Sequence, residues 1–252
     1  MRYLIHTDFG HDPDDAVAIS YLMEQECYPH TIGITPGHIQ QIKSLSGLIN
    51  SYDIDCPSCY ISQNKQFSEK FTVGKHSIFN DNSCLNYELA YEKNFPKFDK
   101  VLIIGPPKNI GDKIECKEMF FQGGYSPNTI YPLEKFKGKV AVQSFNPSGA
   151  KNSFNELLYT KIIKRRYYVG KNVCHGFTKR ELSKIWEPKN KKVKQFWDKL
   201  KPTKAMHDVL AAILFLNKDL GIWEQAMPTW IENKLTTMST DMEIYTLIGL
   251  KT

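Results

Sequence analysis

Short apolar runs alternate with stretches of helical periodicity along the first part of the chain. Runs of aliphatic and aromatic residues with the length of buried strands occupy residues 3–5, 31–35, 59–61, 100–105, 119–124 and 140–142. Apolar positions spaced as on one face of a helix follow several of these runs, at residues 16–23, 39–49 and 89–95. Strands that alternate with helices are typical of a parallel sheet with right-handed crossovers.

The remaining segments complete this architecture. The polar stretch 62–86 has no clear period, and we expect a long loop there, of the kind that often covers a functional site. Beyond Ser153 helical patterns dominate, at residues 156–163, 191–200 and 207–216. The sequence therefore predicts an α/β fold in which residues 1–252 form a single domain, with a mainly parallel central sheet flanked by helices.

Composition limits the classes of protein that remain. The chain has 252 residues and 41% hydrophobic content, enough to bury one large core. No apolar run is long enough to span a bilayer, and Met1 and Arg2 lead directly into a strand, so neither a transmembrane helix nor a signal peptide is indicated. We therefore expect a cytoplasmic protein. The sequence contains no glycine-rich dinucleotide motif and no P-loop, which removes those two kinds of nucleotide site.

Four carboxylates crowd the loop that follows the first strand: Asp8, Asp12, Asp14 and Asp15. Ligands of open α/β sheets bind at this end of the strands. Like charges a few ångströms apart repel each other, so such a cluster favours a bound hard cation with oxygen ligands, calcium or magnesium. The alternative is an acidic helix N-terminus, in which Asp14 and Asp15 cap the helix and interact with its dipole. Capping accounts for one or two of the four carboxylates.

A second acidic signal, His207-Asp208, lies directly before an apolar helix. Taken alone, Asp208 is more typical of a helix cap than of a ligand. Together with the acidic loop and the segments 105–109, 122–124 and 144–147, however, the pair completes a recognisable order. From Arg2 to Phe215 the chain resembles the inosine-uridine nucleoside hydrolase family, and the match depends on order and spacing more than on any single motif.

The resemblance implies an enzyme that hydrolyses the N-ribosidic bond of a nucleoside and releases the base and ribose, with Ca²⁺ as cofactor. It also implies the calcium ligands, which are the carboxylates of Asp8, Asp15 and Asp208 and the backbone carbonyl of Lys108. An all-oxygen set is what calcium prefers. Asp14 corresponds to the general base that takes a proton from the attacking water. Asp12 belongs to a two-residue insertion in the loop and is an alternative base or substrate contact.

The same resemblance assigns the substrate contacts. Asn146 matches a sugar-binding residue, whereas Ser144 occupies the family's Glu position and His38 replaces a ribose-contacting Asn. These departures argue against ordinary purine or pyrimidine nucleosides and leave modified nucleosides open. The basic residues between 179 and 204 leave 5′-phosphorylated substrates open as well, because a cation near the 5′ end favours a phosphate. His207 matches a position near the leaving base. Among the other histidines, His76 and His175 lie in segments that can reach the pocket, although for each histidine the alternative is a purely structural role.

A basic segment, residues 179–204, suggests a function of a different class. Its lysines and arginine alternate with Trp186, Phe196 and Trp197, a combination that suits a nucleotide phosphate or nucleic acid. The other interpretation is a solvated helix whose aromatic residues lie in the core. The alternative function is thus a non-catalytic or nucleic-acid-binding protein built on a hydrolase-like scaffold. The family resemblance also predicts a homo-oligomer.

Overall fold

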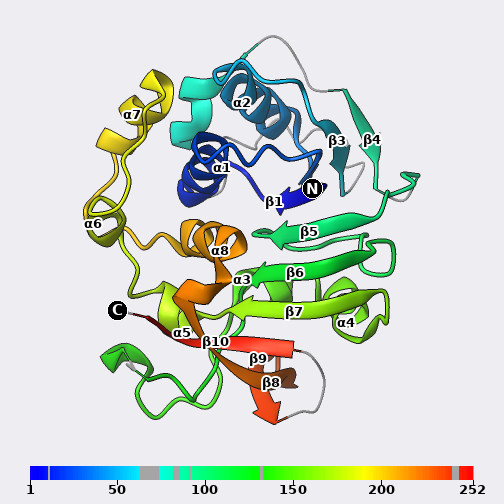
Figure 1. Ribbon diagram of the computed structural model, residues 1–252, viewed down its shortest axis with the longest axis vertical. Helices are drawn as coiled ribbons and strands as arrows, with labels where there is room; N and C mark the ends of the chain where they lie inside the picture. Colours follow the sequence, from blue (N-terminus) through cyan, green and yellow to red (C-terminus); the bar gives the residue numbers. More distant parts are fainter. Residues whose placement is uncertain are drawn as a thin grey trace.

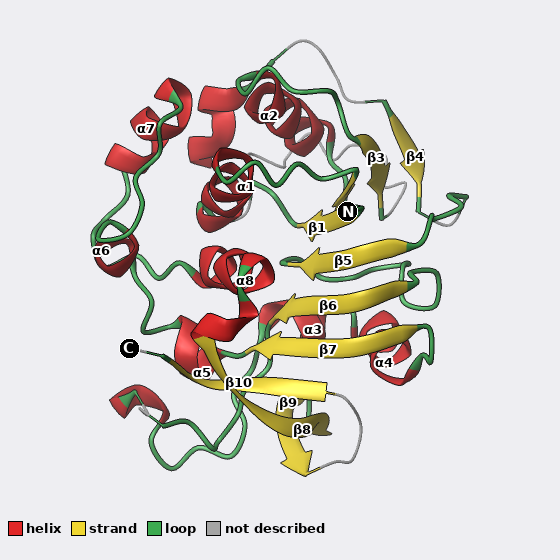
Figure 2. Cartoon of the chain, viewed as in Figure 1, coloured by secondary structure: helices red, strands yellow, loops and turns green. Residues whose placement is uncertain are grey.

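A ten-stranded sheet forms the centre of the computed structural model in the part of the chain that it describes, which comprises residues 1–10, 12–62, 74–81, 86–90, 92–130, 133–239 and 244–251 (Figures 1 and 2). The strands are β1 Tyr3–Thr7, β2 Thr31–Ile34, β3 Ser58–Ile61, β4 Tyr87–Leu89, β5 Phe98–Ile103, β6 Cys116–Gln122, β7 Ile163–Val169, β8 Gly221–Ile231, β9 Lys234–Ser239 and β10 Ile244–Leu250. Their order across the sheet is β4-β3-β2-β1-β5-β6-β7-β10-β8-β9.

Strand direction confirms the predicted parallel sheet. All neighbouring pairs from β4 across to β10 are parallel. At the edge of the described sheet, β8 pairs antiparallel with both β10 and β9. Because β1, β5, β6 and β7 lie side by side and run in one direction, the residues that follow them meet at one edge of the sheet.

The helices connect these strands. They are α1 Asp14–Glu24, α2 Ile39–Asn50, α3 Phe145–Gly149, α4 Lys151–Tyr159, α5 Lys171–Cys174, α6 Lys179–Leu182, α7 Lys191–Asp198 and α8 His207–Leu216, with short 3-10 turns η1 Gly74–Phe79, η2 Glu134–Phe136 and η3 Lys218–Leu220. No helix within the described ranges is long and apolar enough to cross a membrane.

Alternating side chains on the strands bury both faces of the sheet. Ile5 and Leu102 pack in one hydrophobic cluster, while their neighbours Leu4 and Val101 pack in a second one on the opposite face. The first cluster contains residues of α1, α2, α7 and α8, and the second contains residues of α4. The protein therefore has three layers, with helices covering both faces of a mainly parallel sheet.

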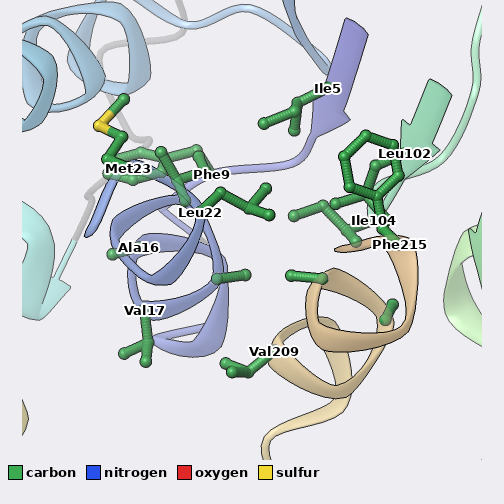
Figure 3. Packing of buried hydrophobic residues seen from close by; sticks show 14 of the residues in the cluster. Ile5, Phe9, Ala16, Val17, Leu22, Met23, Leu102, Ile104, Val209 and Phe215 are labelled. Atoms are coloured by element: carbon green, nitrogen blue, oxygen red, sulfur yellow. The ribbon is translucent and has the colours of Figure 1, made fainter. Parts of the chain in front are cut away.

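Helices α1 and α8 pack against each other over the first face. Ala16, Val17 and Leu22 of α1 belong to the same cluster as Val209 and Phe215 of α8, and Figure 3 shows the two helices side by side, with Leu22 turned toward Ile104 and α8. All five side chains are fully or almost fully buried. This packing fixes the relative position of the two helices. The first turn of α1 carries Asp14 and Asp15, and the first turn of α8 carries Asp208.

Several predicted elements differ from the structure. Residues 89–95 were expected to be helical, but Leu89 ends strand β4, because pairing with β3 overrides the local helical pattern. Residues 140–142 form no strand: this segment has no pairing partner in the described sheet, and Val140 is largely exposed. The helix expected over 156–163 ends at Tyr159, and Ile163 already belongs to β7.

The C-terminal part deviates most. Helices were expected to dominate beyond Ser153, yet β7, β8, β9 and β10 all lie there. The charged start of β7 hides its strand character, because Lys164 and Arg165 are exposed while the buried Arg166 donates hydrogen bonds to the carbonyls of Leu157, Thr160 and Ile163. Of the expected loop 62–86, residues 63–73 and 82–85 lie outside the described residues, and Gly74–Phe79 forms η1.

Candidate active site

A cavity of about 350 Å³ opens at the carboxyl ends of the central strands. It is lined by Asp8, Asp12, Asp14, Asp15, Ile104, Gln122, Ser144, Phe145, Asn146, Lys171, His175, His207 and Asp208. Asp8, Ile104, Gln122 and Lys171 come from the ends of β1, β5, β6 and β7, respectively. The volume is in the range that suits a small organic ligand.

The packing of α1 against α8 brings the aspartates together. Asp14 and Asp15 open α1, Asp208 lies in the first turn of α8, and the backbone N–H of Asp208 donates to Asp14 Oδ2 at 3.2 Å. Asp15 accepts a hydrogen bond from the hydroxyl of Thr7, the last residue of β1. Asp8, Asp14, Asp15 and Asp208 are all buried. Helix capping alone therefore does not explain the cluster, because three separate elements contribute to it.

Burial and mutual repulsion disfavour the charged form of these carboxylates. Burial raises the pKa of Asp8 to about 7, and the charges of Asp14 and Asp12 add to the effect. Burial, followed by the charge of Asp12, raises the pKa of Asp14 to about 7 as well. The pKa values of Asp15 and Asp208 are raised well above their usual range by burial and by the neighbouring aspartates. The site therefore stabilises any added positive charge.

Lys204 supplies one such charge. Its Nζ lies 2.6 Å from Asp12 Oδ1 and 3.5 Å from Asp14 Oδ1. For Asp12, burial raises the pKa, but hydrogen bonds with Asp14 and Lys204 outweigh it and hold the pKa below its usual value. Asp12 is thus the ion-paired and more exposed member of the cluster, whereas Asp14 is buried.

The donor chemistry fits a hard cation. Within the described ranges, no three Asp, Glu, His or Cys side chains are already drawn together as a coordination shell. The buried oxygens of Asp8, Asp15 and Asp208 nevertheless line one cavity and repel each other, which is the situation that a divalent ion with oxygen ligands relieves.

Asn146 forms a second wall of the cavity. Its Nδ2 donates to the carbonyls of Ile104 and Gln122, at 3.0 and 3.1 Å, and to Gln122 Oε1 at 2.8 Å. These bonds hold the amide in one orientation. Ser144 and Phe145 lie beside it at the start of α3.

Two histidines form the third wall. The rings of His175 and His207 lie 4.3 Å apart, centroid to centroid, and the Nε2 atom of each is buried without a hydrogen-bond partner. Burial lowers the pKa of His207 to about 3, with His175 and Lys204 contributing. Burial and Lys135 lower the pKa of His175 to about 4. Both imidazoles are therefore neutral at pH 7 in the metal-free protein.

Three residues expected at the site lie elsewhere. His76 packs in η1 between Phe9 and Phe196, with ring centroids 4.8 and 5.1 Å away. His38 precedes α2, where its backbone N–H donates to Gln41 Oε1. Lys108 borders a separate depression at the start of α4. None of the three lines the cavity, and their roles stay predictions that its geometry does not support.

The basic segment 179–204 has its aromatic residues in the core. Trp186, Phe196 and Trp197 are buried. They are unavailable for stacking on bases, so the nucleic-acid alternative loses the aromatic half of its argument.

Comparison with known proteins supports the fold. No protein-family model and no curated protein matches this sequence. Among solved structures, a purine-preferring ribonucleoside hydrolase from Gardnerella vaginalis is similar, with a TM-score of 0.71 and 16% identity over 99% of this chain and 94% of that one. The chain has the nucleoside hydrolase fold.

Two further solved structures agree. An inosine-uridine preferring nucleoside hydrolase from Bacillus anthracis matches with a TM-score of 0.69 and 13% identity, over 100% of this chain and 95% of that one. The plant nucleoside hydrolase PpNRh1 matches with a TM-score of 0.69 and 13% identity, over 99% of this chain and 95% of that one. The likeness to nucleoside hydrolases thus extends past Phe215, where the sequence resemblance ends, to the C-terminal strands.

The raised pKa of Asp208 predicts how stability depends on pH. A carboxyl that binds its proton more tightly in the folded state adds stability below its unfolded pKa, and this contribution is lost as the pH rises toward the folded pKa. Asn at this position does not titrate. As the pH rises above about 4, we expect the wild type to lose stability relative to Asp208→Asn. The difference between their free energies of unfolding should change in favour of the variant by up to about 1.4 kcal/mol per pH unit.

Denaturant unfolding of both proteins in the presence of a chelator, from pH 4 to pH 8, measures this difference. The comparison cancels the opposite contribution of the histidines, which is the same in both proteins. Two stability curves that run parallel over this range would show that Asp208 is not held in a proton-binding environment.

Proposed function

We propose that this protein is a calcium-dependent hydrolase of the N-ribosidic bond of a nucleoside. The observation that carries the proposal is the meeting of four buried aspartates with Asn146 in one cavity of a nucleoside hydrolase fold. Asp8, Asp15 and Asp208 would hold the ion through their carboxylates, whereas Lys108, the fourth ligand expected from the sequence, does not line the cavity. Bound calcium would supply a positive charge that lowers the pKa of water and orients the ribose hydroxyls.

Asp14 is the general base of the proposed reaction. It lines the cavity beside the proposed ligands, where a carboxylate can accept a proton from the attacking water. The N–H of Asp208 fixes the carboxylate through Oδ2. Asp12 is a weaker candidate, because its ion pair with Lys204 holds its pKa low.

Hydrolysis of an N-ribosyl bond passes through a sugar with oxocarbenium character. Asn146 and the aspartates would hold the ribose, and their interactions strengthen as positive charge develops on the ring. The departing base also needs a hydrogen-bond donor. His207 is neutral at pH 7, so we assign it the role of a donor to the base through its buried Nε2 rather than that of a fully charged acid.

Calcium should stabilise the protein through this cluster. A ligand that binds only the folded state adds about 2.7 kcal/mol when its concentration is one hundred times its dissociation constant. We expect the melting temperature of the wild type to rise with calcium, and Asp8→Ala and Asp208→Ala to lose most of that rise.

Asp112→Ala is a matched control, because Asp112 is exposed and lies outside the cavity. Thermal unfolding with and without calcium measures all four proteins. Equal shifts in every protein would place calcium at some other site.

The reaction itself is tested by base release. Purified protein with calcium is incubated with ordinary and modified nucleosides and nucleoside 5′-monophosphates, and the free base is measured by chromatography. We expect turnover by the wild type and a loss of about 10²- to 10⁴-fold in Asp14→Asn, the contribution typical of a general base.

Asp12→Asn and Asp112→Asn are the controls. Retained activity in Asp14→Asn with loss in Asp12→Asn would reverse the assignment of the base. No release from any substrate would instead favour a non-catalytic scaffold. A homo-oligomer and a cytoplasmic location stay predictions drawn from the sequence.

A further inference from the structure

Lys171 forms the cationic side of the cavity. It is the first residue of α5, one residue beyond the end of β7, its side chain is half-buried, and it lines the cavity together with His175 and His207. No carboxylate among the described residues lies close enough to affect its pKa. Among the described residues, the group that raises that pKa is the thiol of Cys174, which is itself uncharged because burial raises its pKa to about 12.

A second lysine reinforces this charge instead of compensating it. Lys135 lowers the pKa of Lys171, after the larger effect of burial. Its own Nζ lies 2.9 Å from His175 Nδ1. An ammonium group only donates hydrogen bonds, so Nδ1 is the acceptor and the neutral ring of His175 carries its proton on Nε2.

In the part of the chain that the structure describes, that Nε2 atom is a buried donor without a partner, and no acceptor pairs with the Lys171 ammonium group. A buried N–H that lacks an acceptor is costly. In a cavity wall, such groups are satisfied when a ligand brings the acceptor. The acidic cluster does not serve, because its carboxylates are matched by Lys204 or suited to a divalent ion.

The cavity therefore has two poles of opposite charge. Asp8, Asp15 and Asp208 form the acidic pole, and Lys171 with His175 forms the basic one. A neutral sugar suits the remaining polar part of the lining, which includes Asn146. A neutral nucleoside would leave the donors of the basic pole unsatisfied, whereas a substrate with an anionic group would satisfy them with charge-assisted hydrogen bonds.

We propose that Lys171, His175 and Lys135 form a subsite for an anionic group on the substrate, so that the preferred substrate is a nucleoside carrying a phosphate or a carboxylate. The proposal rests on the proposed function in one respect, that the ligand is a nucleoside. Phosphate on the 5′ oxygen and carboxylate on the base are the two sources of this charge, and separate substrates distinguish them.

Turnover provides the first test. Uridine, uridine 5′-monophosphate and orotidine are compared with calcium present, in the wild type, Lys171→Gln and Lys171→Arg. We expect the wild type to prefer one anionic substrate over uridine in kcat/KM. Lys171→Gln should lower that preference by about 10- to 100-fold, the effect of one charge-assisted hydrogen bond, and Lys171→Arg should retain most of it.

Lys164→Gln is the matched control. Lys164 lies on the same strand, β7, near the end away from the cavity, and its side chain is exposed. Lys164→Gln removes the same charge as Lys171→Gln. A general electrostatic effect would therefore appear in both variants, whereas an effect of the subsite would appear in Lys171→Gln alone. Melting temperatures show whether each variant is folded.

Binding provides the second test and needs no turnover. Calorimetry measures ribose 5-phosphate against ribose, and orotate against uracil, in the wild type and both Gln variants. Weaker binding of the anionic ligand in Lys171→Gln alone supports the subsite, even if no nucleoside is cleaved and the proposed function fails. Equal binding of anionic and neutral ligands, or equal anion affinity in Lys171→Gln and the wild type, would overturn the subsite while leaving hydrolysis untouched.

Discussion

The buried carboxylates of this site repel each other, and the packing of the core prevents them from separating. Apolar packing between α1 and α8 holds their first turns together, and strand β1 delivers Asp8 to the same place. Moving the aspartates apart would require that packing to open, at a cost of several kilocalories per mole for the core side chains involved. The repulsion is therefore retained. Lys204 relieves it at Asp12 and Asp14, and the proposed metal ion would relieve it at the remaining carboxylates.

Much of the fold and of the acidic pole was predictable from local sequence. Asp8, Asp14 and Asp15 follow a clear strand and open a clear helix, and the carboxyl edge of a parallel sheet is the expected position of a ligand. Asp208 and Asn146 were predicted from the order of short motifs along the chain. The structure places all five on one cavity.

The basic pole was not predictable in the same way. Lys171 becomes a cavity residue only because it follows β7, and the charged start of β7 concealed that strand in a region where helices were expected. Lys204 looked like part of a solvated basic run, since its ion pair with Asp12 joins positions that are distant in sequence. His76 was expected within reach of the pocket, and the structure packs its ring between Phe9 and Phe196, an aromatic environment that the local sequence does not reveal.

The two poles of the cavity are built from different parts of the chain. The acidic pole depends on α1, α8 and β1, whose positions are fixed by the core, so its geometry is constrained by folding itself. The basic pole comes from short α5 and the η2 turn, where Lys171 is half-buried, Lys135 is exposed, and neither belongs to the hydrophobic clusters. In the proposed enzyme, substitutions at Lys135 or Lys171 would alter which group on the substrate is preferred, while the sugar and the metal stay in place. Specificity would then be separable from the chemistry, because the two depend on different elements.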